Sequence, residues 1–147
     1  MTIVIGPFRD MMALHDRVNR LFDASLNREE GRDEDVERPT WTPAVDIYET
    51  QDSIVVNVEA AGIAKERFAV EVKEDVLTIR GERPFEKDVS REQYHRVERN
   101  YGRFRRSFIL GVPVKVDRIS AAYRDGVLEI VLPKVEEAKP RKIQITE

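Results

Sequence analysis

The 147-residue sequence contains no cysteine, only two histidines and a single tryptophan. Without cysteine, neither a disulfide nor thiolate chemistry is available. His15 and His95 lie near no Gly-x-Ser-x-Gly motif and no residues spaced for metal binding, and no glycine-rich loop could cradle a phosphate. The sequence therefore assembles no catalytic, metal or cofactor site. We expect a protein that is not an enzyme and that works without ATP.

Long apolar runs and a strong net charge are missing as well. Charged residues make up 36% of the chain and apolar residues 41%, and the formal net charge is -3. No segment is long and apolar enough to span a bilayer, and the N-terminus shows no basic region followed by a long apolar core. We therefore expect a cytoplasmic protein with no membrane partner.

The most basic stretch runs from Arg80 to Arg106, where nine Arg or Lys stand against five Asp or Glu. The acidic residues are interleaved with the basic ones, and aromatic residues that could stack on nucleobases, such as Tyr94, Tyr101 and Phe104, are few for a single-strand binder. A solvated or subunit-paired face explains this stretch better. Nucleic acid is therefore not an expected partner.

Residues 1–39 predict an arm that consists of an amphipathic helix and a charged linker. Apolar residues recur every three or four positions, on one face of a helix: Phe8, Met11, Leu14, Val18, Leu21 and Phe22. Residues 27–39 are dense in Arg, Glu and Asp and cannot bury enough apolar surface to become ordered. The helix face either packs on the protein's own core or serves as an interaction surface, and the sequence leaves both readings open.

Residues 40–134 predict an all-β domain. The strand-like segments are Val45–Tyr48, Ile54–Val58, Phe68–Val72, Val76–Arg80, Arg103–Leu110, Ile119–Tyr123 and Val127–Leu132. Most of them alternate apolar and polar residues, as a half-buried strand requires. Short polar connections such as Lys73-Glu74-Asp75 and Arg124-Asp125-Gly126 separate them, and Asp-Gly is a strong hairpin signal. About seven short strands at this spacing predict an immunoglobulin-like β-sandwich.

Two segments lie outside this pattern of strands and short turns. The gap from Glu82 to Gly102 is too long for a hairpin and contains a modest strand candidate, Tyr94–Val97, which is either a surface loop or a strand that pairs with another chain. Residues 135–147 form a C-terminal extension that ends in Ile143-Gln144-Ile145. The ten residues from Pro133 to Lys142 could reach roughly 33 Å when extended, which favours a tethered pair of isoleucines over a frayed edge strand.

Several strings in the second half of the chain resemble the α-crystallin domain of small heat-shock proteins. The strongest is Ala121-Ala122-Tyr123-Arg124-Asp125-Gly126-Val127-Leu128, which is similar to the family's A-x-x-x-N-G-V-L signature with Asp in place of Asn. Both residues tolerate the turn. The stretches Tyr101–Phe108, Pro43–Glu49 and Leu132–Lys134 are also similar to family segments, and Ile143-Gln144-Ile145 is similar to the I-x-I motif that closes family chains. One departure is Gly111, which stands where the family usually has proline, so we expect a reshaped loop there.

The resemblance implies an ATP-independent holding chaperone that forms a dynamic homo-oligomer of dimers and captures unfolding client proteins. It assigns Ile143 and Ile145 to a groove on another subunit, for which we expect Val70, Val72, Ile119 and Ala121, although these residues fit an ordinary core equally well. It also implies that Tyr94–Val97 is exchanged between partners and that Arg106 pairs with an acidic group of the partner. Clients would bind the apolar helix face of Phe8, Met11, Leu14, Leu21 and Phe22, and ATP-driven chaperones would refold them.

Two rival interpretations remain. A monomeric co-chaperone adaptor of the related sandwich type would bind one folded partner, and it would need neither the N-terminal helix nor the terminal isoleucines. A jelly-roll carbohydrate-binding module would need several exposed aromatic residues on one sheet face. Trp41 and four scattered tyrosines support the second rival poorly.

Overall fold

The computed structural model describes residues 39–147 of the chain. The helix and linker predicted before residue 39, and with them the client-binding candidates Phe8, Met11, Leu14, Leu21 and Phe22, lie outside the described residues.

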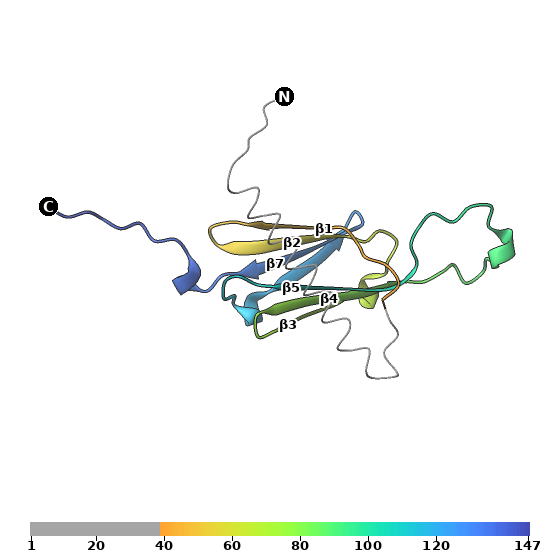
Figure 1. The fold of residues 1–147 in the computed structure, drawn as a ribbon, viewed down its shortest axis with the longest axis horizontal. Helices are drawn as coiled ribbons and strands as arrows, with labels where there is room; N and C mark the ends of the chain where they lie inside the picture. Colours follow the sequence, from red (N-terminus) through yellow and green to blue (C-terminus); the bar gives the residue numbers. More distant parts are fainter. Residues whose placement is uncertain (1–38) are drawn as a thin grey trace, which may run out of the picture.

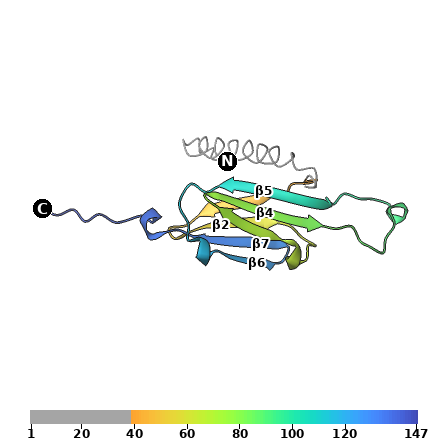
Figure 2. The same cartoon turned by 90° about the horizontal axis from the view of Figure 1, so that it is seen from below.

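Seven antiparallel strands form two stacked sheets, an all-β sandwich (Figures 1 and 2). The four-stranded sheet has the order β1-β2-β7-β6 and the three-stranded sheet the order β3-β4-β5. The strands are β1 (Val45–Glu49), β2 (Ser53–Glu59), β3 (Ala69–Lys73), β4 (Val76–Arg83), β5 (Gly102–Ile109), β6 (Ser120–Arg124) and β7 (Val127–Pro133). Each of the seven predicted strands is thereby confirmed. The largest boundary error is at the end of β4, which continues past Arg80 to Arg83.

The core lies between the two sheets and follows from the alternation in the sequence. On β2 and β7 the register pairs Ile54 with Leu132, Val56 with Ile130, and Val58 with Leu128, and all six side chains are buried. The opposing sheet contributes Leu77, Ile79, Phe104 and Phe108. Each such side chain stabilises the fold by roughly 1.5 to 3 kcal/mol on burial. The period-two pattern therefore determines which face of each strand is buried.

The turn between β6 and β7 shows why the signature tolerates aspartate. Asp125 and Gly126 are the only two residues between the strands, and both have positive φ, at 54° and 77°. A two-residue hairpin that matches the twist of the strands needs positive φ at both positions, and Asp and Gly adopt it at low cost.

Gly81, in the middle of β4, makes room for an aromatic ring. A Cβ atom there would lie 2.4 Å from Cε1 of Phe104, whose ring also contacts Trp41 edge-on at 5.1 Å between centroids. A glycine inside a strand often marks such a close approach.

The segment after β5, where a reshaped loop was predicted, crosses to the other sheet. Leu110 donates its backbone N–H to the carbonyl of Asp75 at 2.7 Å, and Val114 then forms an isolated antiparallel bridge with Lys134. The segment therefore links the two sheets and leaves the sandwich intact, while a loop reshaped by Gly111 stays a prediction.

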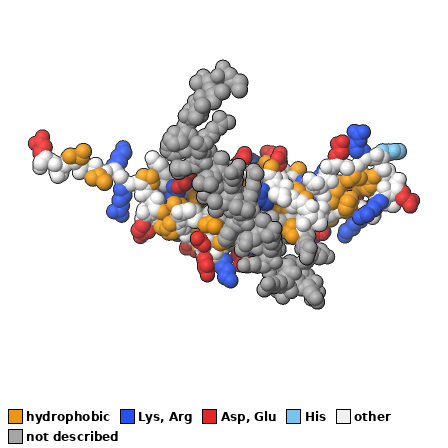
Figure 3. Space-filling view, in the orientation of Figure 1, with side chains coloured by type: hydrophobic (Ala, Val, Ile, Leu, Met, Phe, Trp, Pro, Cys, Tyr) orange, Lys and Arg blue, Asp and Glu red, His pale blue; other side chains and the backbone are white. Residues whose placement is uncertain are grey.

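The loop between β4 and β5 and the C-terminal tail leave the sandwich at opposite ends (Figures 1 and 2). Figure 3 shows apolar side chains in the open on both projections. Among residues 39–147, no helix has the length and apolar character needed to cross a membrane.

Candidate functional site

The edges of the two sheets approach each other at β3 and β6. The rings of Phe68 and Tyr123 are in contact there, with 4.9 Å between centroids. Tyr123 is held in place because its hydroxyl donates a hydrogen bond of 2.8 Å to the carbonyl of Ala60. The two sheet edges are therefore in contact at Phe68 and Tyr123.

The predicted groove residues lie on or next to these two edge strands. We call them the β3–β6 seam and define it as Val70, Val72, Ile119 and Ala121. Register pairs Val70 with Ile79, Val72 with Leu77, and Ala121 with Ile130. Paired residues share a face of their sheet, so these three side chains lie on the inner face.

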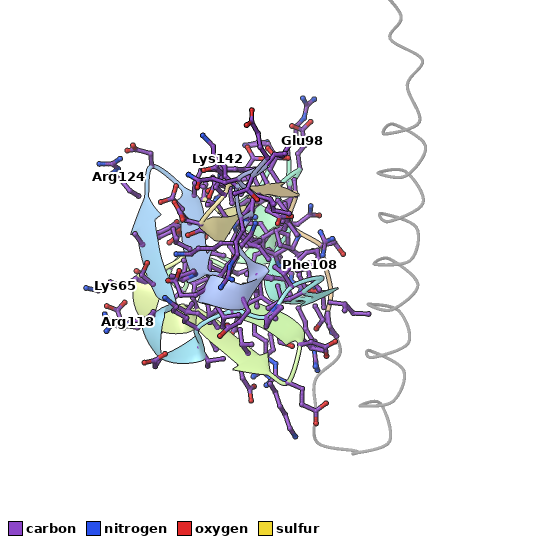
Figure 4. All side chains as sticks on the ribbon, turned by 90° about the vertical axis from the view of Figure 1, so that its left-hand side faces the viewer. Lys65, Glu98, Phe108, Arg118, Arg124 and Lys142 are labelled. Carbon is purple, nitrogen blue, oxygen red and sulfur yellow. The ribbon has the colours of Figure 1, made fainter. Side chains whose placement is uncertain are left out.

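The seam is nevertheless incompletely covered. Val70, Val72 and Ile119 pack against the core but are only partly buried, and Ala121 is exposed. Lys65 and Arg118, which precede the two edge strands, point away from the sandwich on this side (Figure 4). The seam is thus an apolar strip at a sheet edge, flanked by charged side chains. It combines the two roles that the sequence left open, core and accessible surface.

Ile143 and Ile145 are 88% and 98% exposed. Residues 139–147 belong to no strand, so the pair does not extend the chain's own sheet in this structure. In an extended segment the two side chains lie on the same side, because they are two residues apart.

The first part of the predicted tether is fixed to the sandwich. We call residues 134–139 the tail root. The buried Lys134 ammonium donates a 2.8 Å hydrogen bond to the carbonyl of Thr50 and pairs with Glu49. Further along, Glu136 accepts from Lys115 at 3.1 Å and from Lys139 at 3.0 Å. The tether is therefore shorter than the predicted reach of roughly 33 Å from Pro133, because the chain is held as far as Lys139.

Hydrogen bonds at the tail root shift two pKa values. Those from Lys139 and then Lys115 hold the pKa of Glu136 below its ordinary value, and the hydrogen bond to Glu136 raises the pKa of Lys139. The two ion pairs of Glu136, with Lys115 and with Lys139, form what we call the clip. The sequence signal that could have indicated it is the i,i+3 spacing of Glu136 and Lys139.

Replacing Glu136 with glutamine should release the tail root, because it removes both ion pairs. We expect the NMR signals of residues 136–147 to sharpen. In the unmodified protein the pKa of Glu136 is lowered, so the clip should persist as the pH falls to the ordinary range of glutamate and be lost only below it. The glutamine variant should show a mobile tail at every pH. The exposed neighbour Glu137, changed to glutamine, is the matched control, and equal release by the control would contradict the clip.

The predicted dimer residues lie in two places. Tyr94 and Val97 are on the projecting loop, where Val97 is 50% exposed and residues 94–97 form no strand in the single chain. Arg106 is on β5 and donates a 2.8 Å hydrogen bond from Nη1 to the carbonyl of Pro43, within its own chain. Strand exchange and the pairing of Arg106 across an interface therefore stay predictions.

Two contacts at the root of this loop were not predicted from the sequence. Phe85 stacks on Tyr101 with ring centroids 4.1 Å apart, and the guanidinium of Arg83 lies 4.4 Å from the centre of the Trp41 ring. The alternation of β4 could have indicated that Arg83 is buried, because Arg83 lies on the same inward face of the strand as Leu77 and Ile79.

No group of three or more His, Cys, Asp or Glu side chains in residues 39–147 is placed to hold a metal ion. The apolar side chains that the described structure leaves exposed or partly covered lie on the seam, the tail and the loop.

Comparison with known proteins gives a consistent result. The profile of the Hsp20/alpha crystallin family matches residues 46–146. The 17.8 kDa class I heat shock protein of Arabidopsis thaliana is 44% identical over 102 residues, which cover 69% of this chain and 64% of that relative. Small heat shock protein C2 of Rickettsia felis is 35% identical over 103 residues, 70% of this chain and 67% of that relative. The aligned region thus spans about two thirds of these relatives.

Solved structures are similar as well. Heat shock protein 16.0 from Schizosaccharomyces pombe superposes with a TM-score of 0.64 and 31% identity, over 74% of this chain and 100% of that one. A small heat-shock protein from Xylella fastidiosa, described as having a distinct high order structure, superposes with a TM-score of 0.62 and 36% identity over 73% of this chain and 98% of that one.

Proposed function

This chain belongs to the Hsp20/alpha crystallin family, and from that premise we propose that it is a cytoplasmic, ATP-independent holding chaperone that assembles as an oligomer of dimers. The observation that carries the proposal is the exposure of Ile143 and Ile145 on a chain whose β3–β6 seam is apolar and incompletely covered. The tail of one chain has the chemistry to fill the seam of another. The chain then divides into an arm (residues 1–39), a sandwich (residues 40–134) and a connecting tail (residues 135–147).

Each tail-to-seam contact is weak in this proposal. Burying two isoleucines contributes about 3 to 6 kcal/mol before the cost of ordering the tail is subtracted. Many such contacts in one particle add up through effective concentration. The assembly is therefore stable while its individual contacts still open, which lets it rearrange under heat.

The dimer forms through the projecting loop. Tyr94–Val97 adds as a strand to the sheet edge of a second copy, and β1 is the favoured acceptor because its inward Ile47 and outward Tyr48 are 41% and 50% exposed. Arg106 of β5 lies beside the segment that leads into β1, through its bond to Pro43. From there it is suited to pair with an acidic group of the partner.

Clients bind the arm. Unfolding proteins expose apolar surface, and the arm supplies an apolar face made of Phe8, Met11, Leu14, Leu21 and Phe22. Association needs no covalent chemistry, and the flexible Met side chain adapts to many shapes. Release and refolding are left to ATP-driven chaperones. The rival role, a monomeric adaptor, has no use for two isoleucines held in solvent.

The test is heat aggregation of a thermolabile protein followed by light scattering, without nucleotide. An equimolar amount of the purified chain should suppress most of the scattering, and added ATP should change nothing, because hydrophobic association alone holds the client. An equal mass of serum albumin is the control for crowding. Suppression that appears only with ATP would refute the holding mechanism.

A further inference from the structure

The loop of residues 84–101 projects from the sandwich in line with β4 and β5 and does not fold back onto its own sheets (Figures 1 and 2). A loop of this length has no strand partner in the single chain to hold it out. Whatever fixes its direction must therefore act at its root.

Besides the stacked rings of Phe85 and Tyr101, one buried polar side chain joins the two limbs of the loop there. Arg83, the last residue of β4, is 8% exposed. Its Nε donates to the carbonyl of Ala61 and its Nη1 to the carbonyl of Asn100, each at 2.9 Å. Ala61 belongs to the sandwich and Asn100 to the returning limb, so the guanidinium connects the outgoing strand, the returning limb and the sandwich. We call this arrangement the Arg83 clamp.

Trp41 packs against the guanidinium of Arg83 and also bonds to the returning limb. Its ring lies 4.4 Å from the guanidinium carbon, and its Nε1 donates a 2.8 Å hydrogen bond to the carbonyl of Gly102, the first residue of β5. Thr40 adds a 2.8 Å hydrogen bond from its hydroxyl to the carbonyl of Tyr101. A Cβ on Gly102, whose φ is +102°, would lie 2.2 Å from that hydroxyl oxygen. The returning limb is thus bonded at three consecutive carbonyls, those of residues 100, 101 and 102.

Burying the charge of Arg83 costs free energy, which an element with only a structural role would not need. In the described part of the chain no carboxylate forms an ion pair with Arg83, and burial, followed by the charge of Arg99, lowers its pKa. A buried cation without a counter-ion adds little to stability, and an apolar side chain of similar size often serves as well. The guanidinium does what such a side chain cannot, because its rigid fork reaches two carbonyls on different segments.

We propose that Arg83 is a positioning residue, which holds the loop of residues 84–101 outward so that Tyr94–Val97 is ready to pair with a second copy of the chain. The inference rests on the proposed dimer and adds the device that prepares it. A segment that is already held in its bound direction loses less conformational freedom on association, so the clamp lowers the dissociation constant of the dimer.

The test compares Arg83→Lys and Arg83→Met with Arg124→Met, which replaces a side chain that is 90% exposed on the β6–β7 hairpin. Trypsin can cut within the loop at Lys87, Arg91, Arg96 and Arg99. Exchange of subunits between isotopically light and heavy protein is followed by native mass spectrometry. The emission of Trp41, the only tryptophan, reports on the clamp itself, and thermal unfolding reports on the sandwich.

Both Arg83 variants should speed loop cleavage and subunit exchange by about tenfold, since one or two hydrogen bonds to a charged group are lost. Trp41 emission should shift to the red, while the thermal midpoint stays close to that of the control. Lysine should not rescue, because it cannot span both carbonyls. Cleavage and exchange equal to the control, or a loss of thermal stability alone, would overturn the inference. A monomeric unmodified protein would instead refute the dimer, and the cleavage rate would still show whether the clamp holds the loop.

Discussion

Replacing both Ile143 and Ile145 with alanine is expected to reduce the assembly to dimers. Each change removes about 2 kcal/mol of apolar burial from a docked tail, so a contact loses about 4 kcal/mol and weakens about a thousandfold. The sandwich itself should unfold at an unchanged temperature, because the two side chains are 88% and 98% exposed in the single chain. Size-exclusion chromatography with light scattering measures the mass.

Gln144→Ala is the matched control for this double substitution. Gln144 lies between the two isoleucines and points to the opposite side of an extended tail, so its loss should leave the mass of the assembly intact. An unchanged mass for the double variant would show that the tail does not connect the subunits. A loss of mass in the control would show that the tail acts through its backbone and not through the isoleucine pair.

Gly81→Ala should destabilise the sandwich by about 2 kcal/mol and lower its melting temperature by roughly 10 °C. The new Cβ would lie 2.4 Å from the ring of Phe104, which is 2% exposed and cannot move into solvent. Trp41 and Phe68 pack edge-on against the same ring, with centroids 5.1 and 6.2 Å away, so a shift of Phe104 disturbs both neighbours. Thermal unfolding followed by circular dichroism measures the change.

The control for this change is Gly111→Ala. A Cβ on Gly111 meets nothing within 4 Å, and its φ lies outside the range that side chains avoid. This change should be neutral or stabilise by about 0.4 to 1 kcal/mol, because alanine restricts the unfolded chain more than glycine does. Equal destabilisation by both substitutions would mean that the space beside Phe104 is not what makes Gly81 necessary.

The strands could be predicted because the information for each is local. Alternation assigned Ile54, Val56 and Val58 to one face, and all three are buried. The Asp125-Gly126 turn was equally readable, since a two-residue hairpin restricts the residue types that fit it. The exposure of Ile143 and Ile145 followed from their separation from the last strand by a polar, proline-containing segment.

What the sequence did not reveal depends on residues that are far apart in it. Arg83 and Trp41 are in contact only because β4 ends where the segment before β1 passes, and neither residue carries a local pattern for that. The tail root was missed for the same reason, since Lys134 bonds to Thr50 and Lys139 lies 3.5 Å from Asp52, both in the β1–β2 turn. The incomplete covering of the β3–β6 seam has no local signature either, because β3 shows the same alternation of apolar and polar residues whether or not the facing sheet covers Val70.

The tail root has a consequence for the dimensions of a particle. With the chain held as far as Lys139, only Pro140, Arg141 and Lys142 separate the fixed point from Ile143, a span of roughly 13 Å when extended. So short a segment gives the two isoleucines little freedom to move relative to the sandwich. In the proposed assembly, a neighbouring sandwich must lie within a narrow range of distances to receive the two isoleucines, so this short segment restricts the spacing of the subunits. Inserting residues between Lys139 and Ile143 should therefore change the size of the proposed particle.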